Sequence, residues 1–80
     1  MSEDKLRHCF SEALGIAMDT DFESLKYRSI EQWDSLRHMA LVAAIETTFD
    51  IMLEADDVMD MSSFNKAKKI LAKYGIKFDT

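Results

Sequence analysis

The sequence has a single cysteine, so an internal disulfide is excluded. That cysteine, Cys9, precedes the apolar Phe10, and we interpret it as a small core residue rather than a reactive thiol. Long apolar runs are also missing, because none approaches the roughly 20 residues that a membrane-spanning helix needs. The polar start "MSEDK" lacks the apolar segment of a signal peptide. We therefore expect a cytoplasmic protein that does not insert into membranes.

Basic side chains are scarce over most of the chain. Residues 1–65 hold 14 acidic and five basic side chains, whereas residues 66–80 hold five lysines and the single acid Asp79. The acidic part should repel nucleic acid and attract basic partner surfaces. We interpret the lysine-rich end as the solvated face of a helix, so no nucleic-acid partner is expected.

Glycine occurs only at positions 15 and 75, and each glycine follows an apolar pattern of helical period. The patterns predict a first helix over about residues 2–14 and a second that begins at Asp34 and Ser35 and ends at about Phe49. They also predict one or two helical turns within 53–61 and a last helix that begins at Ser62 or Ser63. No alternating strand pattern is present, so the fold class should be all-α. The length allows one domain with a thin core. We predict a small four-helix bundle over residues 1–80, with a long loop between helices 1 and 2 and a short third helix.

The long connection over residues 16–34 contains no proline. A connection of this length in a compact domain indicates a packed loop with local structure. Its expected anchors are Phe22, Leu25 and Ile30. Residues 22–27 are expected to close a short helical turn that is capped by Asp21.

Three groups of residues have the side chains of a catalytic or metal site but the wrong spacing. Asp34, Ser35 and His38 contain the residue types of a hydrolase triad, but they fall within one helical turn and lack the glycines of a nucleophile elbow. We expect His38 instead to pack or form a local hydrogen bond on the core side of the second helix. The stretch "DTDFESLKYRSI" begins like a calcium loop but lacks its glycine and its final glutamate. The acidic residues 54–60 lack a second ligand set, so no metal site is predicted.

The surroundings of Ser35 indicate more than a helix cap, although a serine at a helix start is most often a cap. The helix end offers free N–H groups and a positive potential, which would favour a phosphate ester on this hydroxyl. The same helix carries an apolar strip with acidic borders on the side away from the core. The strip consists of Leu36, Met39 and Ala43, and its borders are Asp34 and Glu46. A strip of this kind suits docking onto a partner.

With these features the chain resembles the acyl carrier proteins, whose attachment motif is Asp-Ser-Leu at the start of the second helix. Here the motif is Asp34, Ser35 and Leu36. The apolar order that follows, up to Phe49 and Asp50, looks like the family pattern "DSL..VELVMALEEEFD". The later stretch "IMLEADDVMDMSSFNKAKKIL" is similar to the short third helix and the final helix of that family. The resemblance covers residues 31–74 closely and the rest of the chain in outline.

The resemblance implies a bundle of acyl-carrier-protein type in which Ser35 receives a covalent 4′-phosphopantetheine arm from coenzyme A. A separate phosphopantetheinyl transferase that uses magnesium would add the arm. The arm's thiol would carry an acyl or aminoacyl group as a thioester and present it to loading and transferring enzymes, while helices that part slightly would shelter an acyl chain. The protein would be a monomer and not an enzyme. The residues expected to contact partners are Asp34, Leu36, Arg37, Met39, Ala43 and Glu46.

Some residues differ from the usual fatty-acid carriers of this family. Arg37, Ala40, Thr47 and Thr48 make the second helix less acidic, and Trp33 looks more like freestanding carriers of specialised pathways. We therefore expect polyketide or peptide assembly, aminoacyl transfer or saccharide acylation rather than bulk fatty-acid synthesis. The alternative function is a helical protein-interaction module that uses the same apolar strip and is never modified.

Overall fold

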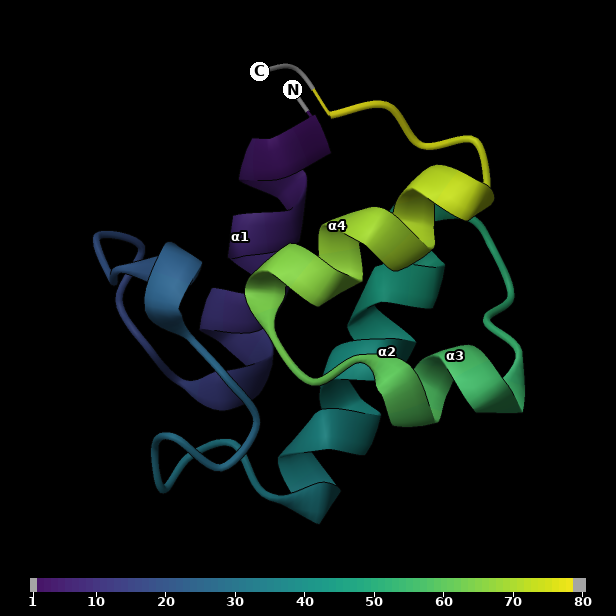
Figure 1. The fold of residues 1–80 in the computed structure, drawn as a ribbon. Helices are drawn as coiled ribbons and strands as arrows, with labels where there is room; N and C mark the ends of the chain where they lie inside the picture. The colour runs from purple at the N-terminus through teal and green to yellow at the C-terminus, as the bar shows by residue number, and fades with distance from the viewer. Residues whose placement is uncertain (1, 79–80) are drawn as a thin grey trace.

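Four α-helices pack around one apolar core in the computed structural model, which describes residues 2–78 (Figure 1). Their bounds are Ser2–Leu14 for α1, Ser35–Phe49 for α2, Ala55–Asp60 for α3 and Phe64–Lys73 for α4, and a short 3₁₀ turn, η1, spans Phe22–Ser24. No strand forms within residues 2–78, where one isolated antiparallel bridge pairs Lys26 with Ser63. The all-α class and the short third helix are therefore confirmed.

The helix ends follow local sequence chemistry. Asp34 accepts the backbone N–H of Arg37 at 2.9 Å and caps α2, and Ser63 accepts that of Lys66 at 2.9 Å and caps α4. Gly15 and Gly75 follow α1 and α4 with φ angles of 68° and 90°, a conformation that side chains with a Cβ disfavour. The predicted bounds are thus confirmed, with one correction: Ser35 is the first helical residue of α2 and not its cap.

The core is formed mainly by α1, α2 and α4. Helix α1 packs along α2, and η1 packs against α4, which crosses in front of α2 in Figure 1. The fully buried large side chains are Trp33, Phe10, Phe64, Leu6, Leu14, Leu41, Ile45, Met61 and Leu71. Cys9 is buried as predicted and donates its thiol hydrogen to Thr48 Oγ1 at 3.3 Å.

The long loop between α1 and α2 is packed, as predicted, but its anchors differ in part. Phe22 and Leu25 are buried, whereas Ile30 is half-buried. Trp33, which the sequence patterns did not mark as an anchor, is completely buried. Asp21 precedes η1 without a side-chain bond to the turn backbone, and its carboxylate instead accepts a hydrogen bond from the Ser24 hydroxyl at 2.9 Å. Asp21 therefore stands at the predicted N-cap position, but its side chain does not cap the turn, and the turn ends at Ser24 rather than at Tyr27.

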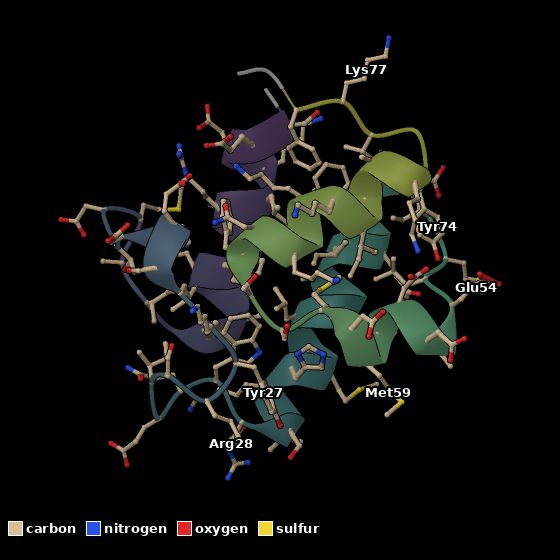
Figure 2. The ribbon with its side chains drawn as sticks, in the orientation of Figure 1. Tyr27, Arg28, Glu54, Met59, Tyr74 and Lys77 are labelled. Carbon is tan, nitrogen blue, oxygen red and sulfur yellow. The ribbon has the colours of Figure 1, made fainter. Side chains whose placement is uncertain are left out.

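Helix α3 makes a group of polar contacts with the end of α4. Its buried residue is an acid, Asp57, whose carboxylate accepts hydrogen bonds from Lys73 Nζ at 2.6 Å and from the Tyr74 hydroxyl at 2.5 Å. The Tyr74 oxygen also accepts the backbone N–H of Glu54 at 3.0 Å, and both residues lie at one end of α3 in Figure 2. The expected inward residues Val58 and Met61 are half-buried and buried, respectively. These contacts join α3 to α4.

No helix of the described residues is long and apolar enough to cross a membrane. The longest helix, α2, has 15 residues, and a bilayer span takes about 20.

Candidate functional site

Ser35 stands at the first position of α2 with its side chain exposed to solvent. Asp34, which is also exposed, turns its carboxylate to the Arg37 N–H and so holds the helix start in place. The N–H groups of Ser35 and Leu36 belong to the first turn, where the helix dipole produces a positive potential. The hydroxyl is therefore accessible, and a phosphate attached to it would be stabilised by this potential.

His38 is not placed to act as a base for Ser35. Its Nδ1 accepts the indole N–H of Trp33 at 3.0 Å, and its Nε2 lies 2.8 Å from the backbone oxygen of Val58. A carbonyl oxygen can only accept, so Nε2 carries the ring proton and donates it. Both ring nitrogens are thus used within the fold. The expectation that His38 forms local hydrogen bonds is confirmed, and the triad geometry is absent.

Tyr27 is a neighbour of Ser35 that sequence reasoning missed. Hydrogen bonding from Ser35, and then from Arg28, lowers the pKa of the Tyr27 phenol. The Arg28 guanidinium also lies over the Tyr27 ring, 5.9 Å from its centroid, and Arg28 has a φ angle of 65° that is uncommon for a residue with a Cβ. Figure 2 shows both side chains beside the start of α2. No local sequence signal pairs position 27 with position 35, because the contact depends on how the loop folds.

A groove with a volume of about 300 Å³ begins at Ser35 and runs between α2 and α3. Met39 lines it from α2, and Val58 and Met59 line it from α3. Tyr27 and His38 also line it, so rings and thioethers make up much of its wall. The volume is at the lower end of the range typical of small-molecule sites. A flexible group attached to Ser35 would have this groove directly beside it.

The predicted apolar strip on α2 is exposed. Leu36 and Met39 are 81% and 56% exposed, and Ala43 is also exposed. Met59, across the groove on α3, is 83% exposed. Large apolar side chains exposed to this degree next to one another are typical of a surface that contacts a partner.

Two of the expected partner residues make contacts within the chain. Arg37 donates to the backbone oxygen of Leu14 at 3.2 Å and thereby ties the start of α2 to the end of α1. Glu46 is half-buried, and its carboxylate accepts the N–H of Leu53 at 2.8 Å, in the segment between α2 and α3. Arg37 and Glu46 therefore each have a role in holding the fold together. Their role in binding a partner stays a prediction.

The residues present fit a 4′-phosphopantetheine arm. The Ser35 hydroxyl is accessible, the start of α2 would favour a phosphate attached to it, and the mostly apolar groove beside it would adjoin the rest of such an arm. Comparisons of the chain with models of protein families, with curated proteins and with solved structures found no match.

Proposed function

We propose that this chain is a carrier protein that holds acyl or aminoacyl groups as thioesters on a 4′-phosphopantetheine arm attached to Ser35. The observation that carries the proposal is the position of Ser35, exposed at the first residue of α2 and at the rim of an apolar groove. The arm, once attached, supplies the thiol that forms the thioester. The chain itself does no chemistry on the cargo and presents it to partner enzymes.

Each residue of the motif has a distinct part in this proposal. Asp34 fixes the first turn of α2 through its bond to the Arg37 N–H, so the Ser35 hydroxyl is held outward. The Ser35 oxygen would form a phosphodiester with the pantetheine phosphate of coenzyme A, losing its proton and displacing adenosine 3′,5′-bisphosphate. Leu36 and Met39 provide exposed apolar surface next to that hydroxyl, on which a transferase or an acyl-handling enzyme would dock.

The test is an intact mass of the purified protein before and after incubation with coenzyme A, magnesium and a broad-specificity phosphopantetheinyl transferase. We expect a gain of one phosphopantetheine on the wild type and no gain on Ser35→Ala. Ser62→Ala is a matched control, because Ser62 is another exposed serine of the same groove, and this variant should load normally. Loading of Ser35→Ala, or no loading of the wild type by a transferase that loads a control carrier, would contradict the proposal.

The second candidate function is an unmodified protein-interaction module, which the exposure of Leu36, Met39 and Met59 favours. This function predicts that unmodified protein binds a partner tightly and that Met39→Asp abolishes binding, because an unpaired charge would be buried at the interface. Met52→Asp is a control, since Met52 is 83% exposed but lies outside the groove. Binding that required a modified Ser35 would instead support the carrier.

The proposal extends to a specialised pathway, such as polyketide or peptide assembly, aminoacyl transfer or saccharide acylation. Its support is the low acidity of α2, where Arg37 and Ala40 follow Ser35 and Thr47 and Thr48 precede the helix end. Partner enzymes that recognise strongly acidic helices would gain little from such a surface. Loading assays with acyl and aminoacyl donors would rank the cargo classes.

A further inference from the structure

Two consecutive residues of the long loop, Tyr27 and Arg28, lie beside Asp34 and Ser35 at the start of α2. Tyr27 and Ser35 both line the groove, and they share a side-chain hydrogen bond. Arg28 and Asp34 both line a separate hollow of about 430 Å³. A group attached to Ser35 would therefore begin next to the Tyr27 phenol and the Arg28 guanidinium.

The loop backbone fixes the positions of both side chains. The N–H of Tyr27 donates to the backbone oxygen of Ser62 at 2.7 Å. In the turn that follows, the N–H of Ser29 donates to the backbone oxygen of Lys26 at 2.9 Å. This turn gives Arg28 its φ angle of 65° and brings its guanidinium over the Tyr27 ring. A left-handed residue with a Cβ is uncommon, and such residues concentrate at functional sites.

A phosphate on Ser35 would need a positive partner, because the neighbouring Asp34 carboxylate has the same sign of charge. Arg37 is already engaged, since it donates to the backbone oxygen of Leu14 at 3.2 Å. Arg28 forms no ion pair with a carboxylate in the part of the chain that the structure describes. A guanidinium presents a planar set of donors that matches phosphate oxygens. Arg28 is therefore the side chain suited to this charge.

Modification of Ser35 would reverse the direction of its hydrogen bond to Tyr27. In the unmodified chain this bond lowers the pKa of the Tyr27 phenol, so the Ser35 hydroxyl is the donor, because a donated bond stabilises the phenolate. Attachment of the arm replaces the Oγ–H bond of Ser35 by an Oγ–P bond. Phosphodiester oxygens only accept hydrogen bonds. The Tyr27 hydroxyl would then be the donor.

We propose that Tyr27 and Arg28 form a clamp for the phosphodiester of the arm, in which the Tyr27 hydroxyl donates to a phosphodiester oxygen and the Arg28 guanidinium pairs with the phosphate charge. The inference rests on the proposed carrier function and deepens it, because it assigns two residues that position the attached group. With its phosphate held at two points, the arm leaves α2 in a fixed direction and does not rotate freely about the Ser35 side chain.

The first test measures the pKa of the Tyr27 phenol in the unmodified protein, by carbon NMR of labelled tyrosine. Ser35→Ala removes a donor, so this pKa should rise, and Arg28→Gln should raise it for the same reason. Ser62→Ala is the matched control, since Ser62 lines the same groove, and it should cause no change. The Tyr74 phenol, which is bonded elsewhere, is an internal control in every sample. An unchanged pKa of Tyr27 in Ser35→Ala would overturn the contact and the clamp.

The second test repeats this titration after the transferase has attached the arm from coenzyme A, with the product checked by intact mass. The pKa of Tyr27 should rise further than in Ser35→Ala, because the phenol now donates and faces a negative charge. The pKa of Tyr74 should not change on loading. A pKa of Tyr27 in the loaded protein no higher than in Ser35→Ala would overturn the clamp, and this comparison needs no variant that loads.

The phosphorus NMR signal of the phosphodiester reports the same contacts from the side of the arm. Tyr27→Phe and Arg28→Gln should each move this signal from its wild-type position, and Tyr27→Phe keeps the ring that packs on Trp33. Arg7→Gln is the matched control, since the Arg7 guanidinium also lies over a ring, 6.0 Å from the centroid of Phe22, and it should leave the signal in place. Equal signals in all four proteins would overturn the clamp.

The failures of the two proposals are distinguishable. No mass gain with a competent transferase overturns the carrier function and this inference with it. A normal mass gain with a pKa of Tyr27 and a phosphorus signal that behave as in the controls overturns this inference alone.

Discussion

The indole N–H of Trp33 donates to Nδ1 of His38 at 3.0 Å, although Trp33 lies in the loop before α2 and His38 within its first turn. Because the loop residue is completely buried, the bond fixes the loop, the helix start and the histidine ring relative to one another. The Val58 oxygen extends this connection to α3. The geometry around Ser35 therefore depends on a residue two positions before it that points into the core.

His38→Ala should lower the free energy of unfolding by about 1–3 kcal/mol, because the buried Trp33 N–H would lose its acceptor. Urea denaturation of the two proteins measures the difference. His8→Ala is the control, because His8 is exposed on α1 and its Nε2 lies 3.2 Å from a carboxylate oxygen of the exposed Glu12. A change of less than about 0.5 kcal/mol is expected. Equal effects of the two substitutions would show that the bond contributes nothing specific to stability.

The neutral His38 ring should carry its proton on Nε2. Nδ1 faces an N–H donor and Nε2 faces a carbonyl oxygen, so only this tautomer satisfies both contacts. Nitrogen chemical shifts of the ring in labelled protein distinguish the two tautomers. A proton found on Nδ1 would contradict the bond to Trp33.

Asp34→Ala and Ser35→Ala should differ in stability. Loss of the Asp34 cap should lower the free energy of unfolding by about 0.5–2 kcal/mol. Ser35 is not the cap, so Ser35→Ala should change it by less than about 0.5 kcal/mol. Denaturation curves of both variants provide the comparison. A larger loss of unfolding free energy for Ser35→Ala than for Asp34→Ala would show that Ser35, and not Asp34, caps α2. A stable Ser35→Ala variant also makes its failure to load interpretable.

The free energy of unfolding should fall at acid pH because the Asp57 carboxylate becomes protonated. Hydrogen bonds from Lys73 and then from Tyr74 hold the pKa of this carboxyl below its ordinary value of 3.8. The stabilisation is therefore fully present above that ordinary value and is lost as the pH falls through the lower pKa of the folded protein. The difference in unfolding free energy between wild type and Asp57→Asn should be constant near neutral pH and shrink below about pH 4. Asp56 is an exposed neighbour on α3, and the difference between wild type and Asp56→Asn should show no such trend. A difference between wild type and Asp57→Asn that grew as the pH fell would contradict the expected direction.

The sequence by itself determined the features that depend on residues close along the chain. Apolar spacing predicted the bounds of α1 and α2, and residue type marked Asp34 and Ser35 as the two possible caps, of which the structure assigns the cap to Asp34. Gly15 and Gly75 were placed at helix ends because a left-handed residue there is a local requirement. The exposed strip of Leu36, Met39 and Ala43 was also predicted, since helical periodicity alone separates it from the core face.

Only the tertiary structure decided the contacts between residues far apart in the chain. In the sequence, Asp57 is one of several acids within residues 54–60 and nothing local distinguishes it, but it is buried because Lys73 and Tyr74 reach it from the end of α4. Glu46 looked like a free surface charge, but the turn after α2 brings the Leu53 N–H to it. Tyr27 and Val58 reach the site around Ser35 and His38 only once the loop and α3 have packed. Local periodicity carries no information on such pairings, because they are selected by the packing of the whole core.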